Sequence, residues 1–593
     1  MQLSLRAVAL ISLHATGVCS NFLGARFPAP VHFSGDGNLI AAAWKNATAV
    51  FDSYFKGDTT VPISLAGLEN LTFSGGVFSV HDPSAQSLQY HYTSDEVKNG
   101  PGAKKVDANT IYRVASITKL ITTFTLHLEL SDKQWDQPIT DFIPGLASSE
   151  LAGNARDRIR FLQWEQVTIR ALASHMAGIP PLAIPWGIDY LLNTTTFEKY
   201  PDPVALGFPA VATDDPAADW KCSVLEAPNC TALNFFQSLK GLPPTFETWT
   251  TSAYANIPFI LLGIALSNVT GKPIAEVYPS SVFGPLGMTN SKSAPPPESE
   301  WSQCAIPKPA GPEFGAPGGL SISSGGLLST VNDLAKLGIA ILNNTHLPAW
   351  KTRKWMKPAS HTNSLTFSSG EVWEIYRFVH PTTGAISDIY TKSGDSGSYT
   401  GYSVLIPDYD AGFNLLTTSS MASAKKTQIA STVADIIITN LLPALEAQAQ
   451  AEAVANFAGT YTSTQANLHS TLKLAYNSTA REPGLYIEEW TYNGTDVPKD
   501  WLGLTPAIQL KLQPSIRQPG QVGFHALFVR PALPAGAVVG PVWEMFSSND
   551  FVGIGGPNYG GVSILDFVFD IGADGKAVAA SPVATRETLK RVA

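Results

Sequence analysis

A serine and a lysine three residues apart could act as a nucleophile and its base. Residues 116–119 read Ser-Ile-Thr-Lys and open a predicted helix. On one helix face the hydroxyl of Ser116 can meet the amine of Lys119, and a buried lysine near apolar groups and a second cation loses its proton easily. The helix N-terminus also offers a backbone N–H to an oxyanion. By itself, this pattern also fits an ordinary N-capped helix start.

Two later motifs could complete such a site. Tyr254–Asn256 precedes an apolar helix and offers a phenol as a second proton carrier and an amide to orient a substrate. Lys392–Gly394 enters a predicted strand and supplies a cation, a hydroxyl and a glycine that substrate backbone can approach closely. An interval of 138 residues separates Ser116 from Tyr254 and also Tyr254 from Lys392. This order and spacing predict a site assembled from two subdomains.

The three motifs resemble those of the serine β-lactamases and penicillin-binding proteins, which read Ser-x-x-Lys, Tyr-x-Asn and Lys-Thr-Gly. Segments 168–180, 284–289 and 318–334 look like signatures of class C β-lactamase-like proteins, so the resemblance covers roughly residues 75–440. It implies an α/β (α+β) fold of the β-lactamase/transpeptidase type. We therefore expect an antiparallel five-stranded sheet flanked by helices, an all-α subdomain and a site between them. Secreted fungal relatives of this family also carry a C-terminal β-barrel-like domain.

The resemblance implies a role for each motif residue. Ser116 is expected to be the acylated nucleophile, Lys119 its base, and Tyr254 the group that passes protons to the leaving group. Asn256 is expected to hold a substrate carbonyl. Lys392 is expected to supply positive potential and to tune Tyr254.

The third motif departs from the family pattern. Ser393 replaces threonine and keeps a hydroxyl in the substrate-binding set, while Gly394 is retained. The backbone N–H groups of Ser116 and Asp395 are expected to form the oxyanion hole. Asp395, however, stands where β-lactamases commonly have a small residue, and its carboxylate would repel the carboxylate that β-lactams carry. This departure argues against penicillin hydrolysis without affecting the acyl-transfer machinery.

These residues predict a serine hydrolase or acyltransferase that acts through an acyl-enzyme on an ester, an amide or a D-amino-acid peptide. Its partner would be a small molecule or peptide, and a role in small-molecule metabolism is favoured over antibiotic resistance. The alternative is a non-catalytic descendant that serves as a binding module or scaffold, but the complete motif set favours the enzyme. The eleven histidines lack metal-ligand spacing, and we expect no metal and no cofactor.

Three weaker patterns do not favour a different function. Residues 394–398 imitate the nucleophile loop of trypsin-like proteases, but that family needs an upstream His and Asp in a disulfide-rich double barrel. His175 is expected to be structural and to satisfy backbone near the turn at 178–180. The aromatic and asparagine content of the C-terminal part is assigned to core and surface rather than to a sugar-binding groove.

Apolar periodicity predicts the elements that position the motifs. Two strands joined at Asp82-Pro83 are expected within 75–92, and further strands at 399–406 and 412–417. Helices are expected at 116–130, 257–267, 331–342 and 428–441. Short alternating runs predict an all-β C-terminal domain, at 472–476, 484–490, 508–512, 523–529, 542–546 and 563–569.

The 593 residues divide into a signal peptide (1–20), a catalytic domain (21–443), a helical or flexible junction (444–456) and a β-barrel-like domain (457–593). With 44% hydrophobic and only 15% charged residues, the chain suits packed domains rather than intrinsic disorder. A net charge of −9 gives no basic footprint for nucleic acid.

The N-terminus predicts export. One positive charge, an apolar stretch over 7–13 and small residues near position 20 are typical of a signal peptide, and the stretch is too short to span a bilayer. The most apolar later segment, 257–266, is broken by Pro258 and Gly263. We therefore expect a secreted protein with no membrane span.

An oxidising compartment would allow disulfides and N-glycans. Of the four cysteines, Cys19 would leave with the signal peptide. Cys222 and Cys230 lie eight residues apart and are expected to pair, which leaves Cys304 as an odd thiol, buried or reactive. Eight Asn-x-Ser/Thr sites predict a glycoprotein, at Asn46, Asn70, Asn193, Asn229, Asn268, Asn343, Asn477 and Asn493.

Overall fold

The computed structural model describes residues 24–147, 157–180, 207, 209, 231–239, 243–308, 312–480, 482–531, 536 and 554–592. The predicted signal peptide, Cys222, Cys230, the sequons at Asn193 and Asn229 and the strand expected at 542–546 lie outside these residues. The chain divides into two compact units. The larger unit is Lys45–Arg377 with Ile389–Ile438, and the C-terminal unit is Met1–Trp44, Phe378–Asp388 and Thr439–Ala593.

An eight-stranded sheet lies at the centre of the larger unit, with the strand order β2-β1-β10-β9-β8-β7-β6-β5. Its recorded pairings are antiparallel. The sheet is wider than the five strands that the family resemblance implies, because β2 extends one edge and the β5–β6 pair the other. The strands are β1 (Thr72–Ser79), β2 (Gln89–Tyr92), β5 (Pro358–His361), β6 (Phe367–Gly370), β7 (Glu374–Val379), β8 (Ile386–Ser396), β9 (Tyr399–Ile406) and β10 (Ala411–Thr418).

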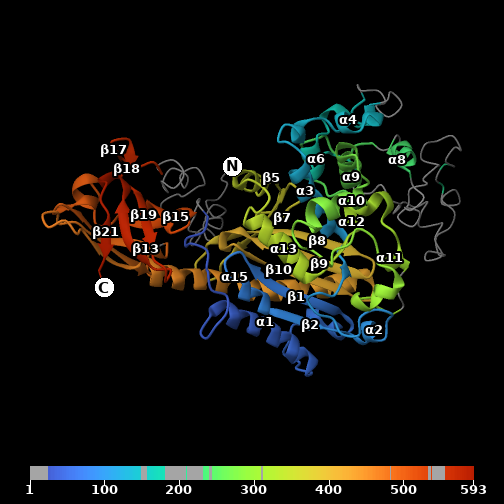
Figure 1. Ribbon diagram of the computed structural model, residues 1–593, viewed down its shortest axis with the longest axis horizontal. Coiled ribbons are helices and arrows are strands. Elements are labelled where there is room, and N and C mark those ends of the chain that lie inside the picture. Colours follow the sequence, from blue (N-terminus) through green and yellow to red (C-terminus); the bar gives the residue numbers. More distant parts are fainter. Residues whose placement is uncertain are drawn as a thin grey trace, which may run out of the picture. The chain divides into compact units, whose positions relative to one another are not determined.

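Helices cover both faces of this sheet, because successive strand residues point to opposite sides. Phe73 of β1 packs against Phe51 of α1 (Leu39–Phe55), with ring centroids 5.6 Å apart. On the opposite face, Gly76 leaves room for Val331 at the start of α13 (Val331–Leu342). Figure 1 shows α1 along one side of the sheet and α3, α9 and α12 on the other.

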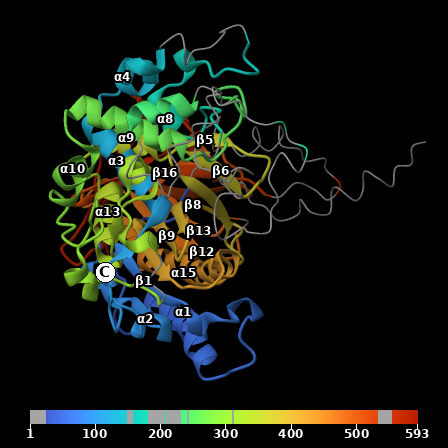
Figure 2. The same cartoon turned by 90° about the vertical axis from the view of Figure 1, so that its right-hand side faces the viewer.

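The helices on the α13 side form the expected all-α subdomain, and Figure 2 shows α3, α9 and α10 grouped together there. Most residues of α9 are buried, as in a core helix. The helices predicted at 116–130, 257–267 and 331–342 are confirmed. Besides α1 and α13, this unit contains the helices α2 (Asp95–Lys98), α3 (Thr118–Glu129), α4 (Ile139–Phe142), α6 (Ile169–Ala173), α8 (Ala232–Leu239), α9 (Ile257–Thr270), α10 (Ile274–Tyr278), α11 (Pro312–Gly315), α12 (Ile322–Gly325) and α14 (Ala349–Trp355), with the short strands β3 (Tyr112–Arg113) and β4 (Leu328–Ser329).

A 35-residue helix, α15 (Ser423–Phe457), runs through the predicted junction and through Pro443 without ending. The sequence predicted a helix only at 428–441, with a helical or flexible junction after it. Of the helices in the described ranges, α15 alone has the length and hydropathy to cross a membrane, unless α9 and the segment after it count as one span across a 75° bend. The most apolar 18-residue stretch of α15 is 44% buried inside the protein. Core helices of soluble proteins can have the same length and hydropathy.

The C-terminal unit contains a nine-stranded sheet in the order β12-β11-β21-β20-β19-β16-β15-β13-β14. β12 pairs with β11 and also with β13, near the other end of the strand order. This sheet confirms the all-β domain that the sequence predicted. Aromatic rings of Phe457, Tyr461, Phe524 and Phe569 pack edge to face within it. Its strands are β11 (Gly459–Thr462), β12 (Thr471–Asn477), β13 (Gly484–Tyr492), β14 (Thr495–Asp496), β15 (Gln509–Gln518), β16 (Gln521–Val529), β19 (Asp566–Ile571), β20 (Ala577–Pro582) and β21 (Leu589–Arg591), and β17 (Asn558–Tyr559) and β18 (Val562–Ser563) form a separate pair.

The N-terminal segment belongs to this second unit, although the sequence-based division placed 21–443 in one domain. Glu452 of α15 accepts hydrogen bonds from the backbone of Val31 and His32, at 2.7 and 3.1 Å. The ring of Phe27 lies 6.4 Å from that of Tyr476. The C-terminal unit is therefore built from segments that are distant in sequence. A division of the chain into consecutive domains assigns such segments to different domains.

Candidate active site

Ser116 lies in a 3-10 turn, Ala115–Ile117, that leads directly into α3. Ala115 has a φ of 44°, in the left-handed region that a residue with a Cβ rarely adopts. Such strain is held only where surrounding structure imposes it, and it concentrates at functional sites. The turn leaves Ser116 half-buried while its neighbours in α3 are buried.

The amine of Lys119 is fully buried and makes three contacts. Its Nζ lies 3.0 Å from Ser116 Oγ, 2.7 Å from Asn256 Oδ1 and 2.5 Å from the backbone oxygen of Ser324. A neutral amine has two N–H groups and one lone pair. Asn256 and Ser324 offer only acceptors here, so they take both N–H groups and leave the lone pair directed at the Ser116 hydroxyl.

The electrostatics around Lys119 favour that neutral amine. Burial lowers the pKa of Lys119; Tyr254 opposes this shift, and the positive charge of Lys392 adds to it. The net pKa of Lys119 lies below the ordinary lysine value. The pocket thus makes this amine a stronger candidate for a base than an exposed lysine would be.

Tyr254 lies on the other side of the serine. Its hydroxyl is 2.6 Å from Ser116 Oγ, and the Nζ atoms of Lys119 and Lys392 lie 5.1 and 5.0 Å from the centre of its ring. Burial raises the pKa of Tyr254, but the two lysines and the hydrogen bonds lower it by more. Tyr254 is 42% exposed, so a leaving group arriving from solvent can reach it.

Glu374, at the start of β7, is the partner of the Lys392 motif. Its Oε1 forms an ion pair with Lys392 Nζ and accepts a hydrogen bond from Ser393 Oγ at 3.0 Å. Its Oε2 accepts a hydrogen bond from Ser393 N at 2.8 Å. Burial lowers the pKa of Lys392, but Glu374 and Tyr254 together raise it by more, so Lys392 is held as a cation. The sequence analysis did not identify Glu374.

Gly394 lies against the backbone of the serine turn. A Cβ at this position would come within 2.3 Å of Val114 O and 3.1 Å of Ser116 N. Only glycine therefore allows β8 to approach the backbone N–H of Ser116. This places the third motif beside one of the two N–H groups expected in the oxyanion hole, with Asp395 as the next residue along the strand.

The Asp395 side chain does not have the position that the sequence analysis assumed. Its Oδ1 lies 2.9 Å from Lys426 Nζ and 3.1 Å from Thr427 Oγ1, both in α15, and 2.7 Å from Thr400 Oγ1. Asp395 pairs with Thr400 in the sheet, and this residue pair points to the α15 side. Since this carboxylate is held by residues of α15, repulsion of a substrate carboxylate cannot be assigned to Asp395.

His175 supports the Tyr254 motif rather than the nearby turn at 178–180. Its Nδ1 accepts a hydrogen bond from Ala255 N at 3.2 Å, and its ring lies 4.7 Å from that of Tyr254. Burial, with the charges of Lys392 and Lys119, lowers the pKa of His175 well below its ordinary value. The imidazole is therefore a neutral structural group, as the sequence analysis expected in general terms.

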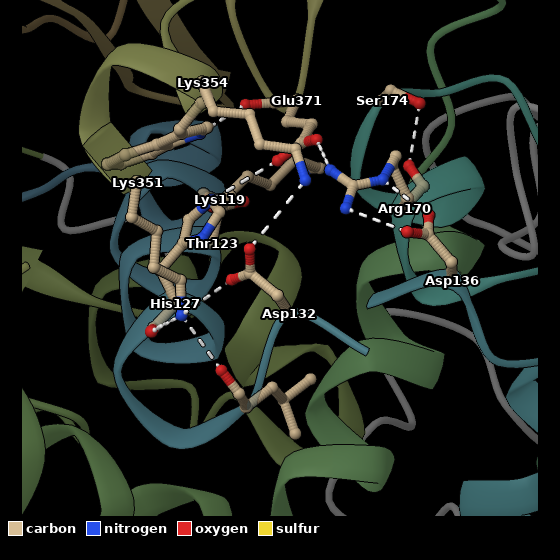
Figure 3. Close-up of polar contacts among 12 residues, drawn as sticks. Lys119, Thr123, His127, Asp132, Asp136, Arg170, Ser174, Lys351, Lys354 and Glu371 are labelled. Atoms are coloured by element: carbon tan, nitrogen blue, oxygen red, sulfur yellow. Dashed lines mark hydrogen bonds and ion pairs between the residues drawn. The ribbon is translucent and has the colours of Figure 1, made fainter. Parts of the chain in front are cut away.

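A partly buried charge network connects the site elements. Figure 3 shows Arg170 of α6 between the carboxylates of Glu371 and Asp136. Glu371 also lies 3.3 Å from Nε2 of His127 near the end of α3. Since Glu371 precedes Glu374 by three residues, the network connects the helix of Ser116, the segment of His175 and the start of β7.

The predicted glycosylation sites and the odd cysteine differ in exposure. Among the described sequons, Asn477 is partly buried and the others are exposed: Asn46, Asn70, Asn268, Asn343 and Asn493. Cys304 is buried, and burial raises the pKa of its thiol to about 12, so it is the buried rather than the reactive kind of thiol.

Two family models match the chain. Residues 39–434 match the family described as Beta-lactamase, and residues 449–593 match the one described as Beta-lactamase-like-like, C-terminal domain. The first range contains all three motifs of the site. The second begins within α15 and covers the all-β sheet.

Curated relatives agree with these matches. A Beta-lactamase-like protein of Arthroderma benhamiae is 29% identical, with 74% of this chain and 69% of the relative aligned. The Probable hydrolase clz13 of Cochliobolus lunatus is 24% identical, over 72% of this chain and 69% of the relative. A solved class C β-lactamase from Rhodobacter sphaeroides has 18% identity and a TM-score of 0.44, over 67% of this chain and 99% of that one. Because the first family match spans more than half of the chain and includes every motif of the site, the chain belongs to the β-lactamase family.

Proposed function

We propose that this protein is a serine hydrolase or acyltransferase that forms an acyl-enzyme on Ser116. The observation that carries the proposal is the contact set of Lys119: two fixed acceptors and the nucleophile around one buried amine. Membership of the β-lactamase family and hydrolase-named fungal relatives support the same class of reaction. The acyl donor would be an ester, an amide or a D-amino-acid peptide of small-molecule or peptide size.

In the first step, the Ser116 proton moves to Lys119 Nζ while Oγ forms a bond to the carbonyl carbon of the donor. The backbone N–H groups of Ser116 and Asp395 would hold the oxyanion, and Gly394 keeps the space beside Ser116 N open. Tyr254 then gives its proton to the leaving group as the bond to that group breaks. The proton that Lys119 accepted then passes to the phenolate of Tyr254, whose ring centre lies 5.1 Å from the lysine Nζ, and this restores both groups for the second step.

In the second step, water or another acceptor attacks the acyl-serine ester. The same base removes the proton of the acceptor and delivers it to Oγ as the ester bond breaks, so Ser116 leaves as the neutral hydroxyl. Asn256 is held by Lys119 at its oxygen, which leaves its amide N–H groups as donors for a substrate carbonyl. The acceptor decides between hydrolysis and acyl transfer.

Labelling with a neutral fluorophosphonate tests this proposal. We expect intact-mass analysis to show one phosphonyl group on the wild-type protein and peptide mapping to place it on Ser116. Ser116→Ala should take up none, and its hydrolysis of any substrate found should fall by several orders of magnitude. Labelling of Ser116→Ala at the wild-type rate would move the nucleophile elsewhere.

We also propose that the protein is exported and glycosylated. Protein recovered from the medium of a fungal host should start near residue 21 and lose mass on treatment with an N-glycosidase. Non-reducing peptide mapping should link Cys222 to Cys230. Pairing of Cys304 with either of them would contradict this assignment, and the burial of Cys304 speaks against it.

A further inference from the structure

We propose that Glu374 selects against acyl donors that carry a carboxylate. Its own carboxylate already makes the contacts with Lys392 and Ser393 that a donor carboxylate would make. The donor would then carry no carboxylate on its leaving-group side, in contrast to a β-lactam. This inference rests on the proposed function of the Ser116 site and names its substrate class. It assigns to Glu374 the discrimination that the sequence analysis attributed to Asp395.

The contacts of Glu374 are those of a bound carboxylate. One oxygen pairs with the Lys392 ammonium and accepts a hydrogen bond from the Ser393 hydroxyl, and the other accepts a hydrogen bond from the Ser393 N–H. A cation, a hydroxyl and a backbone N–H together make a carboxylate-binding set, in which charge-assisted hydrogen bonds are the strong ones. All three of these donors already have the same internal acceptor.

Charge balance leads to the same conclusion. The side chain of Lys392 is 1% exposed, and that of Glu374 is 19% exposed. The carboxylate is therefore the member of the pair that solvent and substrate can reach. With Lys119 neutral in the working enzyme, the Lys392–Glu374 pair leaves no net positive charge among these three groups to attract an anionic donor.

The pair is close to the chemistry. Lys392 Nζ lies 5.0 Å from the ring centre of Tyr254, whose hydroxyl contacts Ser116 Oγ. A donor carboxylate on the leaving-group side would approach the largely buried carboxylate of Glu374, where like charges repel more strongly than in water. We expect this repulsion to lower kcat/KM for such a donor by at least about tenfold.

Two matched donors provide the test. The first is the phenylacetate ester of 3-hydroxybenzoic acid, which carries a carboxylate on its leaving group; the second is the same ester with that carboxylate methylated. We expect the wild-type protein to favour the methylated donor by about tenfold or more in kcat/KM. A wild-type preference for the free acid would overturn the inference before any variant is made.

Glu374→Gln removes the charge and keeps the shape. We expect the ratio of kcat/KM for the methylated donor to that for the free acid to fall by about tenfold or more. Glu374→Asp retains the charge and should keep the ratio near that of the wild type. A ratio that is the same in Glu374→Gln and in the wild type would overturn the inference.

Glu482→Gln is the matched control, since Glu482 also pairs with a buried lysine, Lys511, but in the C-terminal unit. The same loss of one negative charge there should leave the ratio unchanged; an equal fall of the ratio would trace the effect to overall charge and overturn the role of Glu374.

Fluorophosphonate labelling of Ser116 separates the two proposals. Labelling with an unchanged ratio contradicts only the inference, whereas absence of labelling contradicts the proposed function and the inference together.

Discussion

Two buried lysines in different regions of this protein have opposite surroundings. Lys511, in the all-β sheet of the C-terminal unit, is 1% exposed and forms an ion pair with Glu482. Lys119, beside Ser116 in the larger unit, is 0% exposed and is surrounded by a hydroxyl, an amide oxygen and a backbone oxygen. In the part of the chain that the structure describes, no carboxylate lies within ion-pair distance of Lys119.

The difference shows how one side chain serves structure in one place and chemistry in another. A carboxylate beside a buried ammonium compensates its lost hydration, and the pair becomes a structural element. Without a carboxylate, burial favours the neutral amine, which can take a proton. Lys392 is the intermediate case: it lies in the site, but Glu374 keeps it charged. The predictions below change one member of this comparison at a time.

The largest effect is expected for Lys119→Met, which keeps an unbranched side chain but removes the base. The rate of Ser116 acylation by a fluorophosphonate should fall by about 10³-fold or more, because the two residues act as a unit. Lys119→Arg should fail similarly, since arginine keeps its proton. The rate is measured by quenching the reaction at set times and determining the intact mass. Acylation of Lys119→Met within tenfold of the wild-type rate would assign the base to another residue, with Tyr254 the first candidate.

Lys511→Met should act on stability instead. It leaves Glu482, whose side chain is 13% exposed, without its cation, and breaking such a pair costs about 3 kcal/mol. Urea unfolding measures this loss. Lys473 and Glu488 form a pair at 3.0 Å on the surface of the same sheet, so Lys473→Met is the matched control and should leave the free energy of unfolding unchanged. Equal losses in both variants would contradict the structural role of the buried pair.

Lys392→Met should change the pH dependence of acylation. Acylation needs neutral Lys119, so its rate rises with pH until that amine has lost its proton. Burial lowers the pKa of Lys119, and the charge of Lys392 lowers it further. Removing this cation, and leaving Glu374 unpaired, should therefore raise the pKa of Lys119 and move the rising limb of the pH–rate profile to higher pH. A limb that moves to lower pH would contradict neutral Lys119 as the base.

The smallest effect on the site is expected for Asp395→Asn. Its carboxylate is directed to Lys426 and Thr427 of α15, so the preference between the carboxylate and methyl-ester donors should stay within about twofold of the wild type. Thermal unfolding should show the change instead, because Lys426 loses the carboxylate of its ion pair. A preference that falls as far as in Glu374→Gln would return the discriminating role to Asp395.

Local signals in the sequence identified most elements around the site. The helix at 331–342 and the strand at 399–406 have the predicted ends, because helical period, alternation and flanking turn residues are properties of neighbouring residues. The strands β11, β20 and β21 were not predicted. They are short, and the sheet that orders them joins residues over 100 positions apart, such as Tyr461 and Arg591.

Sequence by itself determined the residue types and the spacing of the motif set, since Ser116 and Lys119 must share a helix face wherever that helix packs. It also determined the alternation that makes the C-terminal region all-β. Only the tertiary structure decided which carboxylate pairs with Lys392. Glu374 meets Lys392 because β7 is placed beside β8, whereas Asp395 meets Lys426 because its side of β8 is covered by α15. Strand pairing and the covering of a sheet face depend on contacts between distant parts of the chain, and no local pattern of residues records them.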